Sequence, residues 1–110
     1  MLARSGLERL TTRRAPDQLT DAEQHAHEIA KAEHLVFVHP YDDADIIAGQ
    51  GTIALEMLED VPDLETLCVP IGGGGMCSGI AAAAKGLNPL IKIYAAEPAG
   101  AADAFRSKEG

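Results

Sequence analysis

Apolar residues recur at helical spacing over residues 20–33, and a strand-like run follows directly. Thr20 and Glu23 form the Ser/Thr-x-x-Glu arrangement of a capping box, which predicts a helix that begins there and ends near Glu33. One stripe of the helix consists of Ala22, His25, Ala26, Ile29 and Ala30, and within it His25 is expected to lie at the surface. Leu35–Val38 is a continuous apolar run that predicts a parallel strand buried on both faces. Leu7–Thr11 alternates loosely and predicts an earlier strand.

The rest of the chain continues to alternate between helical and strand-like patterns. Helical patterns are a short turn capped within Asp42–Asp45, then Thr52–Leu58, the alanine-rich Met76–Gly86, and a segment starting at Asp103. Strand patterns are Leu67–Ile71 and Ile91–Ala96. This alternation predicts the α/β class with a parallel sheet of about four strands. The pattern does not close on itself, so we expect the chain to be part of a larger fold.

Composition fits one globular domain and argues against a membrane or a nucleic acid as a partner. The 110 residues are 46% hydrophobic and 24% charged, which is ordinary for a folded protein. No apolar run is long enough to cross a bilayer and no secretory signal opens the chain, so we expect a cytoplasmic protein without membrane contact. The net charge is −8, and fifteen of the seventeen acids lie in residues 20–110. We therefore expect no nucleic-acid partner.

Isolated cysteine, histidine and tyrosine residues give weaker signals. Cys68 and Cys77 lack the spacing of a disulfide framework or a zinc site and are expected to be buried free thiols. His39 follows a predicted strand at the end where ligands approach α/β sheets, and Tyr41 lies close behind it. Both a role in lining a site and an ordinary packing role remain open for these two residues.

The strongest local motif is the run Gly72–Gly75 between a predicted strand and a predicted helix. Consecutive glycines are entropically unfavourable, so they suggest a positive φ or a group that approaches the backbone closely. The amino end of the following helix would present free amides to an anion, which predicts a phosphate-binding loop. A plain tight turn between strand and helix is the alternative.

Two common nucleotide motifs do not match this glycine run. No lysine follows it before Lys85, which excludes a Walker loop. The dinucleotide fingerprint fails narrowly, because Ser78 stands where the third glycine belongs and Gly79 comes one position later. Glu97 lies about where a ribose-binding acid would be expected. A dinucleotide-binding βαβ unit of an oxidoreductase therefore remains an alternative.

Four motifs in this order closely resemble serine racemases and catabolic threonine/serine dehydratases. These are pyridoxal-phosphate enzymes of fold type II, in the tryptophan synthase beta-like superfamily. The resemblance runs from about Gly6 to Gly110 and covers only the middle of a family chain. The motifs are His39-Pro-Tyr-Asp-Asp43, Ile46-Ile-Ala-Gly-Gln-Gly-Thr-Ile-Ala-Leu-Glu56, Val69-Pro-Ile-Gly-Gly-Gly-Gly-Met-Cys-Ser-Gly-Ile80 and Tyr94-Ala-Ala-Glu-Pro98.

The resemblance implies a fold, a cofactor and a cation site. It implies part of a three-layer α/β enzyme, with residues 1–41 in the small domain and 42–110 in the large cofactor-binding domain. It places the phosphate of pyridoxal 5'-phosphate on Gly72, Gly73, Gly74 and Gly75 and the amide of Met76. It also implies Mg²⁺ or Ca²⁺ on Glu97, the Ala101 carbonyl and Asp103, for which a solvated acidic turn is the alternative. Full-length relatives are expected to be homo-oligomers, as dimers, that act on serine or threonine.

The same resemblance shows which parts of a family site this chain lacks. The Schiff-base lysine belongs to a Ser-x-Lys-x-Arg-Gly segment, and a Ser-x-Gly-Asn loop holds the ring and the substrate; neither motif occurs here. No catalytic residue is assigned, and we expect no activity from this chain alone. We interpret it as a fragment of a serine/threonine ammonia-lyase (dehydratase) or serine racemase. A noncatalytic remnant or docking module is the alternative, and racemisation and elimination are not distinguished. We further expect a piece of this kind to self-associate.

Overall fold

The computed structural model describes residues 2–3 and 19–109, and the chain divides into two compact units. The first unit is Met1–Pro40 and the second is Tyr41–Gly110. The division falls one residue before the boundary expected from the sequence. The assignment of the two units to a small and a large domain stays a prediction.

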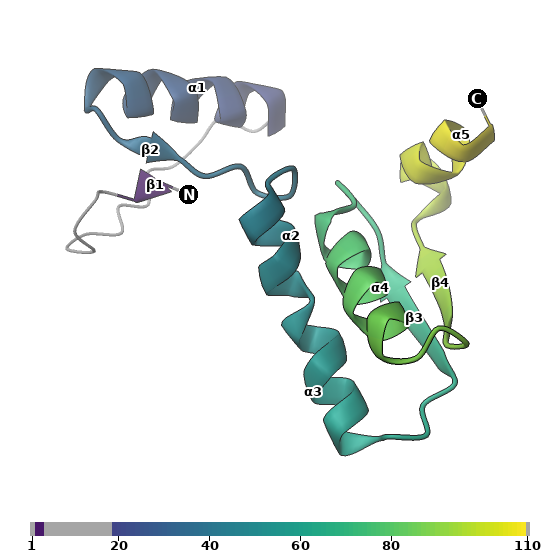
Figure 1. Cartoon of the computed structure of the whole chain (residues 1–110). Coiled ribbons are helices and arrows are strands. Elements are labelled where there is room, and N and C mark those ends of the chain that lie inside the picture. The colour runs from purple at the N-terminus through teal and green to yellow at the C-terminus, as the bar shows by residue number, and fades with distance from the viewer. Residues whose placement is uncertain (1, 4–18, 110) are drawn as a thin grey trace. The chain divides into compact units, whose positions relative to one another are not determined.

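The first unit pairs a helix with two very short strands (Figure 1). α1 spans Leu19–Ala32, within a residue of the predicted helix at each end. β1 (Leu2–Ala3) and β2 (Val36–Phe37) are antiparallel, with Leu2 opposite Phe37. The expectation of a parallel strand buried on both faces over Leu35–Val38 is therefore wrong. Val36 is 62% exposed, because the described residues supply no layer to cover that side of β2.

A left-handed residue ends α1 and turns the chain toward β2. His34 has a φ of 52°, and the Leu35 amide donates to the Ala30 carbonyl at 2.8 Å. This is the six-residue closure of a Schellman-type cap, in which the left-handed position is more often glycine. The strand predicted at Leu7–Thr11 lies outside the described residues.

The second unit is a βαβ arrangement preceded by two helices and followed by a short one. Its β3 and β4 are parallel and in register from Thr66 opposite Lys92 to Pro70 opposite Ala96, which confirms the α/β class with a parallel sheet. The expectation of one sheet of about four strands is wrong for the described residues, which form two separate strand pairs, β1–β2 and β3–β4. In chain order the elements are α2 (Ala44–Gln50), α3 (Thr52–Asp60), β3 (Thr66–Pro70), α4 (Gly75–Leu87), β4 (Lys92–Ala96), η1 (Ala99–Ala101) and α5 (Asp103–Glu109).

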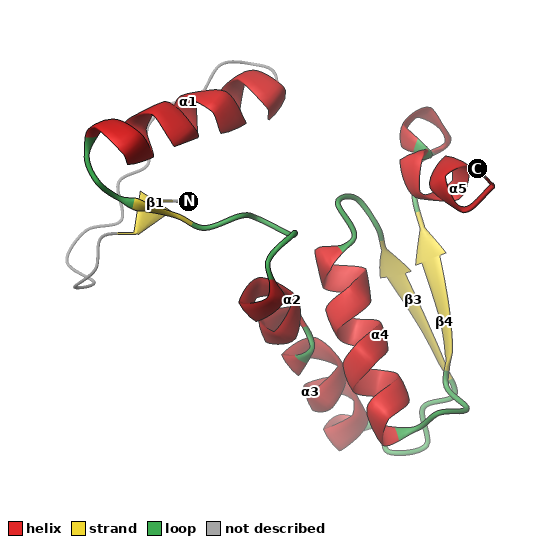
Figure 2. Ribbon diagram, turned by 45° about the horizontal axis from the view of Figure 1, so that its top comes forward, coloured by secondary structure: helices red, strands yellow, loops and turns green. Residues whose placement is uncertain are grey.

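Helices cover one face of this strand pair. Figures 1 and 2 show α4 between the α2–α3 pair and the two strands. Burial alternates along β3, with Leu67 and Val69 inside and Cys68 outside, as expected for a strand packed on one face. The expectation that Cys68 is buried is therefore wrong, and Cys77 is half-buried. The core cluster consists of Ala54, Leu67, Val69, Ile80, Ala84 and Ile91.

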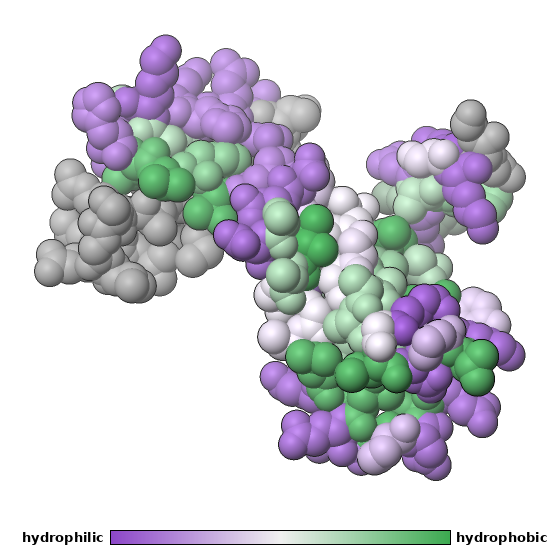
Figure 3. Space-filling view, viewed as in Figure 1, coloured by the Kyte–Doolittle hydropathy of each residue, from purple (hydrophilic) through white to green (hydrophobic). Residues whose placement is uncertain are grey.

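Large apolar side chains remain on the surface of the second unit (Figure 3). The most exposed of these are Leu90, Leu87, Tyr94 and Phe105. None of the helices described is both long and apolar enough to cross a membrane. The small core and the exposed apolar residues fit a unit that packs against further protein.

Candidate functional site

The glycine run lies at the edge where both parallel strands of the second unit end. Gly72–Gly75 follow β3 closely, and α4 begins at Gly75. The Ile71 amide donates to the Ala96 carbonyl at 2.9 Å, which joins the carboxyl ends of β3 and β4 just before the run. Open parallel sheets bind their ligands outside this edge.

Different contacts require glycine at different positions of the run. Gly74 has a φ of 91°, a left-handed conformation that disfavours any Cβ. A Cβ added at Gly73 would lie 2.5 Å from both Cδ atoms of the Tyr41 ring, and one added at Gly75 would lie 2.5 Å from the Tyr41 carbonyl oxygen. A Cβ added at Gly72 meets no heavy atom within 4 Å. The fold itself explains three of the glycines, and the open side of Gly72 is accessible to a ligand.

The amino end of α4 offers unpaired amides beside this open space. In the described chain, its N-cap residue Gly74 makes no side-chain cap hydrogen bond. The Ser78 amide donates to the Gly74 carbonyl at 2.9 Å, which is the first bond of the helical ladder. The amides of Gly75, Met76 and Cys77 come before this bond, and no carbonyl within the helix can accept a hydrogen bond from them. Together with the positive end of a 13-residue helix, they favour an anion here.

A close contact between helices fixes the position of α4. A Cβ on Gly79 of α4 would overlap the Ile47 carbonyl oxygen and lie 2.9 Å from the Gly51 amide nitrogen. The α2–α3 pair can approach α4 this closely because residue 79 is glycine, and the contact at Gly51 is tight as well, with an added Cβ 3.1 Å from the Gly79 carbonyl oxygen. Upstream, the Asp43 carboxylate accepts hydrogen bonds from the amides of Asp45 at 2.9 Å and Ile46 at 3.2 Å, which caps α2.

The three residues predicted to bind a cation lie on one stretch after β4. Glu97 accepts hydrogen bonds from the amides of Ala104 at 3.2 Å and Phe105 at 2.8 Å, so its carboxylate caps the start of α5. Asp103 is mostly exposed and lies 3.7 Å from Arg106. Ala101 ends the single turn of η1. Among the described residues, no cluster of three or more His, Cys, Asp or Glu side chains could hold a metal ion. The cation site therefore stays a prediction.

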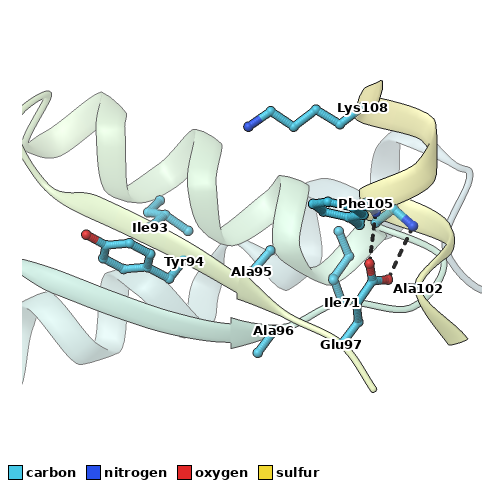
Figure 4. Close-up of a pocket in the computed structure, with 10 residues that line it drawn as sticks. Ile71, Ile93, Tyr94, Ala95, Ala96, Glu97, Ala102, Phe105 and Lys108 are labelled. Atoms are coloured by element: carbon cyan, nitrogen blue, oxygen red, sulfur yellow. Dashed lines mark hydrogen bonds between the residues drawn. The ribbon is translucent and has the colours of Figure 1, made fainter. Parts of the chain in front are cut away.

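A mostly apolar cavity of about 710 Å³ lies beside this capping carboxylate (Figure 4). Tyr94, Ala95 and Ala96 of β4 form one wall, and Phe105 and Lys108 of α5 form another. Consecutive residues of β4 line the cavity, and alternate residues of a strand point to opposite faces. The cavity therefore follows the length of β4 and is not confined to one face of it. Its lining includes Ile71, the residue directly before Gly72, so the cavity borders the glycine loop without containing Gly72–Met76.

The remaining candidates divide between the two units. Tyr41 packs on the glycine loop, so the structure places it at the candidate site. His39 belongs to the first unit, where its Nε2 lies 3.8 Å from Glu23 Oε1. Lys85 donates to the Ile91 carbonyl at 2.8 Å and thereby links α4 to the start of β4. Sequence reasoning missed the contact partners of the loop, because Tyr41 lies more than thirty residues before it.

Comparison with known proteins identifies the family of the chain. The model of the pyridoxal-phosphate dependent enzyme family matches residues 7–110. A serine racemase from Arabidopsis thaliana is 49% identical over 90 residues, which are 82% of this chain and 27% of that protein. The maize serine racemase structure has a TM-score of 0.80 at 43% identity, covering 86% of this chain and 29% of the maize chain. The tomato threonine deaminase isoform 2 structure has a TM-score of 0.71 at 38% identity, covering 77% and 23%. This chain thus spans less than a third of the length of each.

Proposed function

The chain belongs to the pyridoxal-phosphate dependent enzyme family, and from this premise we propose that Gly72–Met76 bind the phosphate of pyridoxal 5'-phosphate. The observation that carries the proposal is the uncapped amino end of α4 next to the open side of Gly72. Backbone amides there can donate to phosphate oxygens without displacing any side chain. The absence of a Cβ at Gly72 lets an anion reach them.

We propose that the loop serves an enzyme that acts at Cα of serine or threonine, as a racemase or an ammonia-lyase. This rests on the relatives, which include serine racemases and a threonine deaminase. When bound, pyridoxal phosphate supplies an electron sink for the negative charge that develops at Cα. The residues of this chain contribute binding and orientation: the loop amides hold the phosphate, and the Gly79 contact keeps α4 in place behind them.

A cation at Glu97, the Ala101 carbonyl and Asp103 is a second proposal for the same enzyme. The donors are all oxygen atoms, which suits Mg²⁺ or Ca²⁺ completed by water. Both carboxylate oxygens of Glu97 already accept amide hydrogen bonds from α5, so a bound cation must share or replace these bonds. Hydrogen exchange of the α5 amides with and without Ca²⁺ tests this. A cation that shares Glu97 with the amides should slow their exchange, and a cation that replaces these hydrogen bonds should speed it. Unchanged exchange would contradict the proposal.

Amide spectra of the chain during a ligand titration test the phosphate proposal. We expect pyridoxal phosphate to shift the amide signals of Gly72–Met76 in a saturable way. Pyridoxal, which lacks the phosphate, is the matched control and should leave them in place. NADH distinguishes the dinucleotide alternative, because a dinucleotide-binding unit should bind NADH more tightly than pyridoxal phosphate. Equal shifts with pyridoxal and pyridoxal phosphate would contradict phosphate binding at the loop.

A further inference from the structure

Tyr41 covers one side of the glycine loop, with both its ring and its backbone. The ring lies against Gly73, where an added Cβ would come within 2.5 Å of both Cδ atoms. The carbonyl oxygen and Cα lie against Gly75, at 2.5 Å and 2.9 Å from an added Cβ. We propose that Tyr41 is the positioning residue that holds Gly73–Met76 in the conformation that binds phosphate.

The loop therefore has two differently occupied sides. The positions that would point a Cβ at Tyr41 are Gly73 and Gly75, whereas Cβ atoms at Gly72 and Gly74 would point into open space. Tyr41 backs the loop on the first side and leaves the second side free for an anion. Tyr41 as a residue is 38% exposed, so it lies over the loop at the surface of the unit.

A run of four glycines needs an external support of this kind. Glycine loses more backbone freedom than any other residue on ordering, and the run has no side chains of its own to restrict it. The apparent affinity of a ligand equals its affinity for the correctly shaped loop multiplied by the fraction of time for which the free loop has that shape. An aromatic ring packed on Gly73 restricts the loop before the ligand arrives.

The position of Tyr41 is itself fixed by the helix that follows it. Asp43, two residues later, caps α2 through the amides of Asp45 and Ile46. α2 in turn is held against α4 at the Gly79 contact. The support for the loop thus comes from the same pair of helices that positions the amino end of α4.

The contact atoms indicate which part of the side chain matters. Cγ and the Cδ atoms lie nearest to Gly73, so the ring and not the phenol hydroxyl makes the contact. Tyr41→Phe keeps these atoms and should behave as the unchanged chain. Tyr41→Ala removes them, and Tyr41→Leu keeps apolar bulk without a flat ring. Tyr94→Ala is the matched control, because it removes the second tyrosine of the chain, which lies in β4 and is not among the nearest atoms to Gly73 or Gly75.

The inference deepens the proposed phosphate site and rests on it for its binding readout. Backbone amide order parameters of the ligand-free 110-residue chain, measured by NMR relaxation, give the second readout, which needs no ligand. For Tyr41→Ala, we expect the order parameters of Gly73–Met76 to fall from about 0.85 to below about 0.6, with about a tenfold loss of affinity for pyridoxal phosphate and inorganic phosphate. Tyr41→Phe and Tyr94→Ala should keep the order parameters of the unchanged chain and stay within about twofold in affinity. Tyr41→Leu replaces Tyr41→Ala if the latter does not fold.

The outcomes separate the two proposals. If the unchanged chain binds neither phosphate ligand, the proposed function fails, and the order parameters alone decide whether Tyr41 orders the loop. Lower order parameters with undiminished affinity would show a purely structural ring and overturn the positioning role. Unchanged order parameters in Tyr41→Ala, or equal losses in Tyr41→Phe and Tyr41→Ala, would overturn it as well.

Discussion

Two glycines of α4, Gly79 and Gly86, should respond in opposite directions to replacement by alanine. Both are helical, so alanine brings the same intrinsic gain of about 1 kcal/mol in helix stability at each position. Their surroundings differ. An added Cβ at Gly79 overlaps the Ile47 carbonyl oxygen and lies 2.9 Å from the Gly51 nitrogen, whereas one at Gly86 meets nothing within 4 Å.

The magnitude at Gly79 follows from the atoms that the Cβ meets. They are backbone atoms, which cannot rotate away, so α2 and α4 must move apart. Overpacking destabilises by roughly 1–3 kcal/mol. Contacts with fixed backbone atoms place this case in the upper part of that range, at about 2–3 kcal/mol, and the helix gain offsets about 1 kcal/mol of it. We expect Gly79→Ala to lower the free energy of unfolding by about 1–2 kcal/mol. Gly86→Ala should raise it by about 0.5–1 kcal/mol.

Denaturant unfolding followed by circular dichroism checks this pair. Protein concentration must be the same for both variants, because association raises apparent stability. A difference of about 1.5–3 kcal/mol between the variants corresponds to melting temperatures that differ by on the order of 10 °C in a domain of this size. If both alanines stabilise the chain, the close approach of α2 to α4 is not a feature of the protein in solution.

Four further predictions concern the glycine loop, two helix caps and the exposed apolar residues. Gly74→Ala places a Cβ at φ 91° and should lower the free energy of unfolding by roughly 1–2 kcal/mol; equal stability in a melting experiment would show that the loop is not left-handed there. Asp43→Ala removes the cap of α2 at a loss of about 1 kcal/mol, while Asp43→Asn keeps most of it; identical denaturation midpoints for the two variants would contradict the cap. Glu97→Ala should speed hydrogen exchange in α5 selectively, because two amides lose their acceptor, and a uniform change along the chain would speak against that role. The exposed Leu87, Leu90, Tyr94 and Phe105 predict self-association in light scattering, against which a sharply melting monomer would count.

Local sequence signals predicted the helices of this chain well. The Ser/Thr-x-x-Glu pattern at Thr20 and the end of the glycine run at Gly75 mark the starts of α1 and α4 to within a residue or two, although Thr20 lies inside α1 and does not stand before it as a cap. Such signals act between residues a few positions apart, which is why the sequence reveals them. The phosphate-loop hypothesis has the same origin, because the strand, the glycines and the helix are consecutive.

The errors concern features that depend on distant residues. The apolar run at Leu35–Val38 resembles a strand buried on both faces, but burial depends on which layers cover it, and β1 is its partner here. Cys68 lies in an equally apolar strand whose outer side is bare. The contact of Tyr41 with Gly73 joins residues far apart in sequence, so no periodicity could reveal it.

The affinity of two glycine variants for pyridoxal phosphate tests the central claim most directly. Gly72→Ala and Gly86→Ala each add one methyl group where the fold leaves open space, so both should fold. Calorimetric titration should give an affinity for Gly86→Ala equal to that of the unchanged chain. Gly72→Ala should bind at least about a hundredfold more weakly, because its Cβ lies where the phosphate approaches. Equal affinities for both variants would show that the ligand does not bind at the glycine loop.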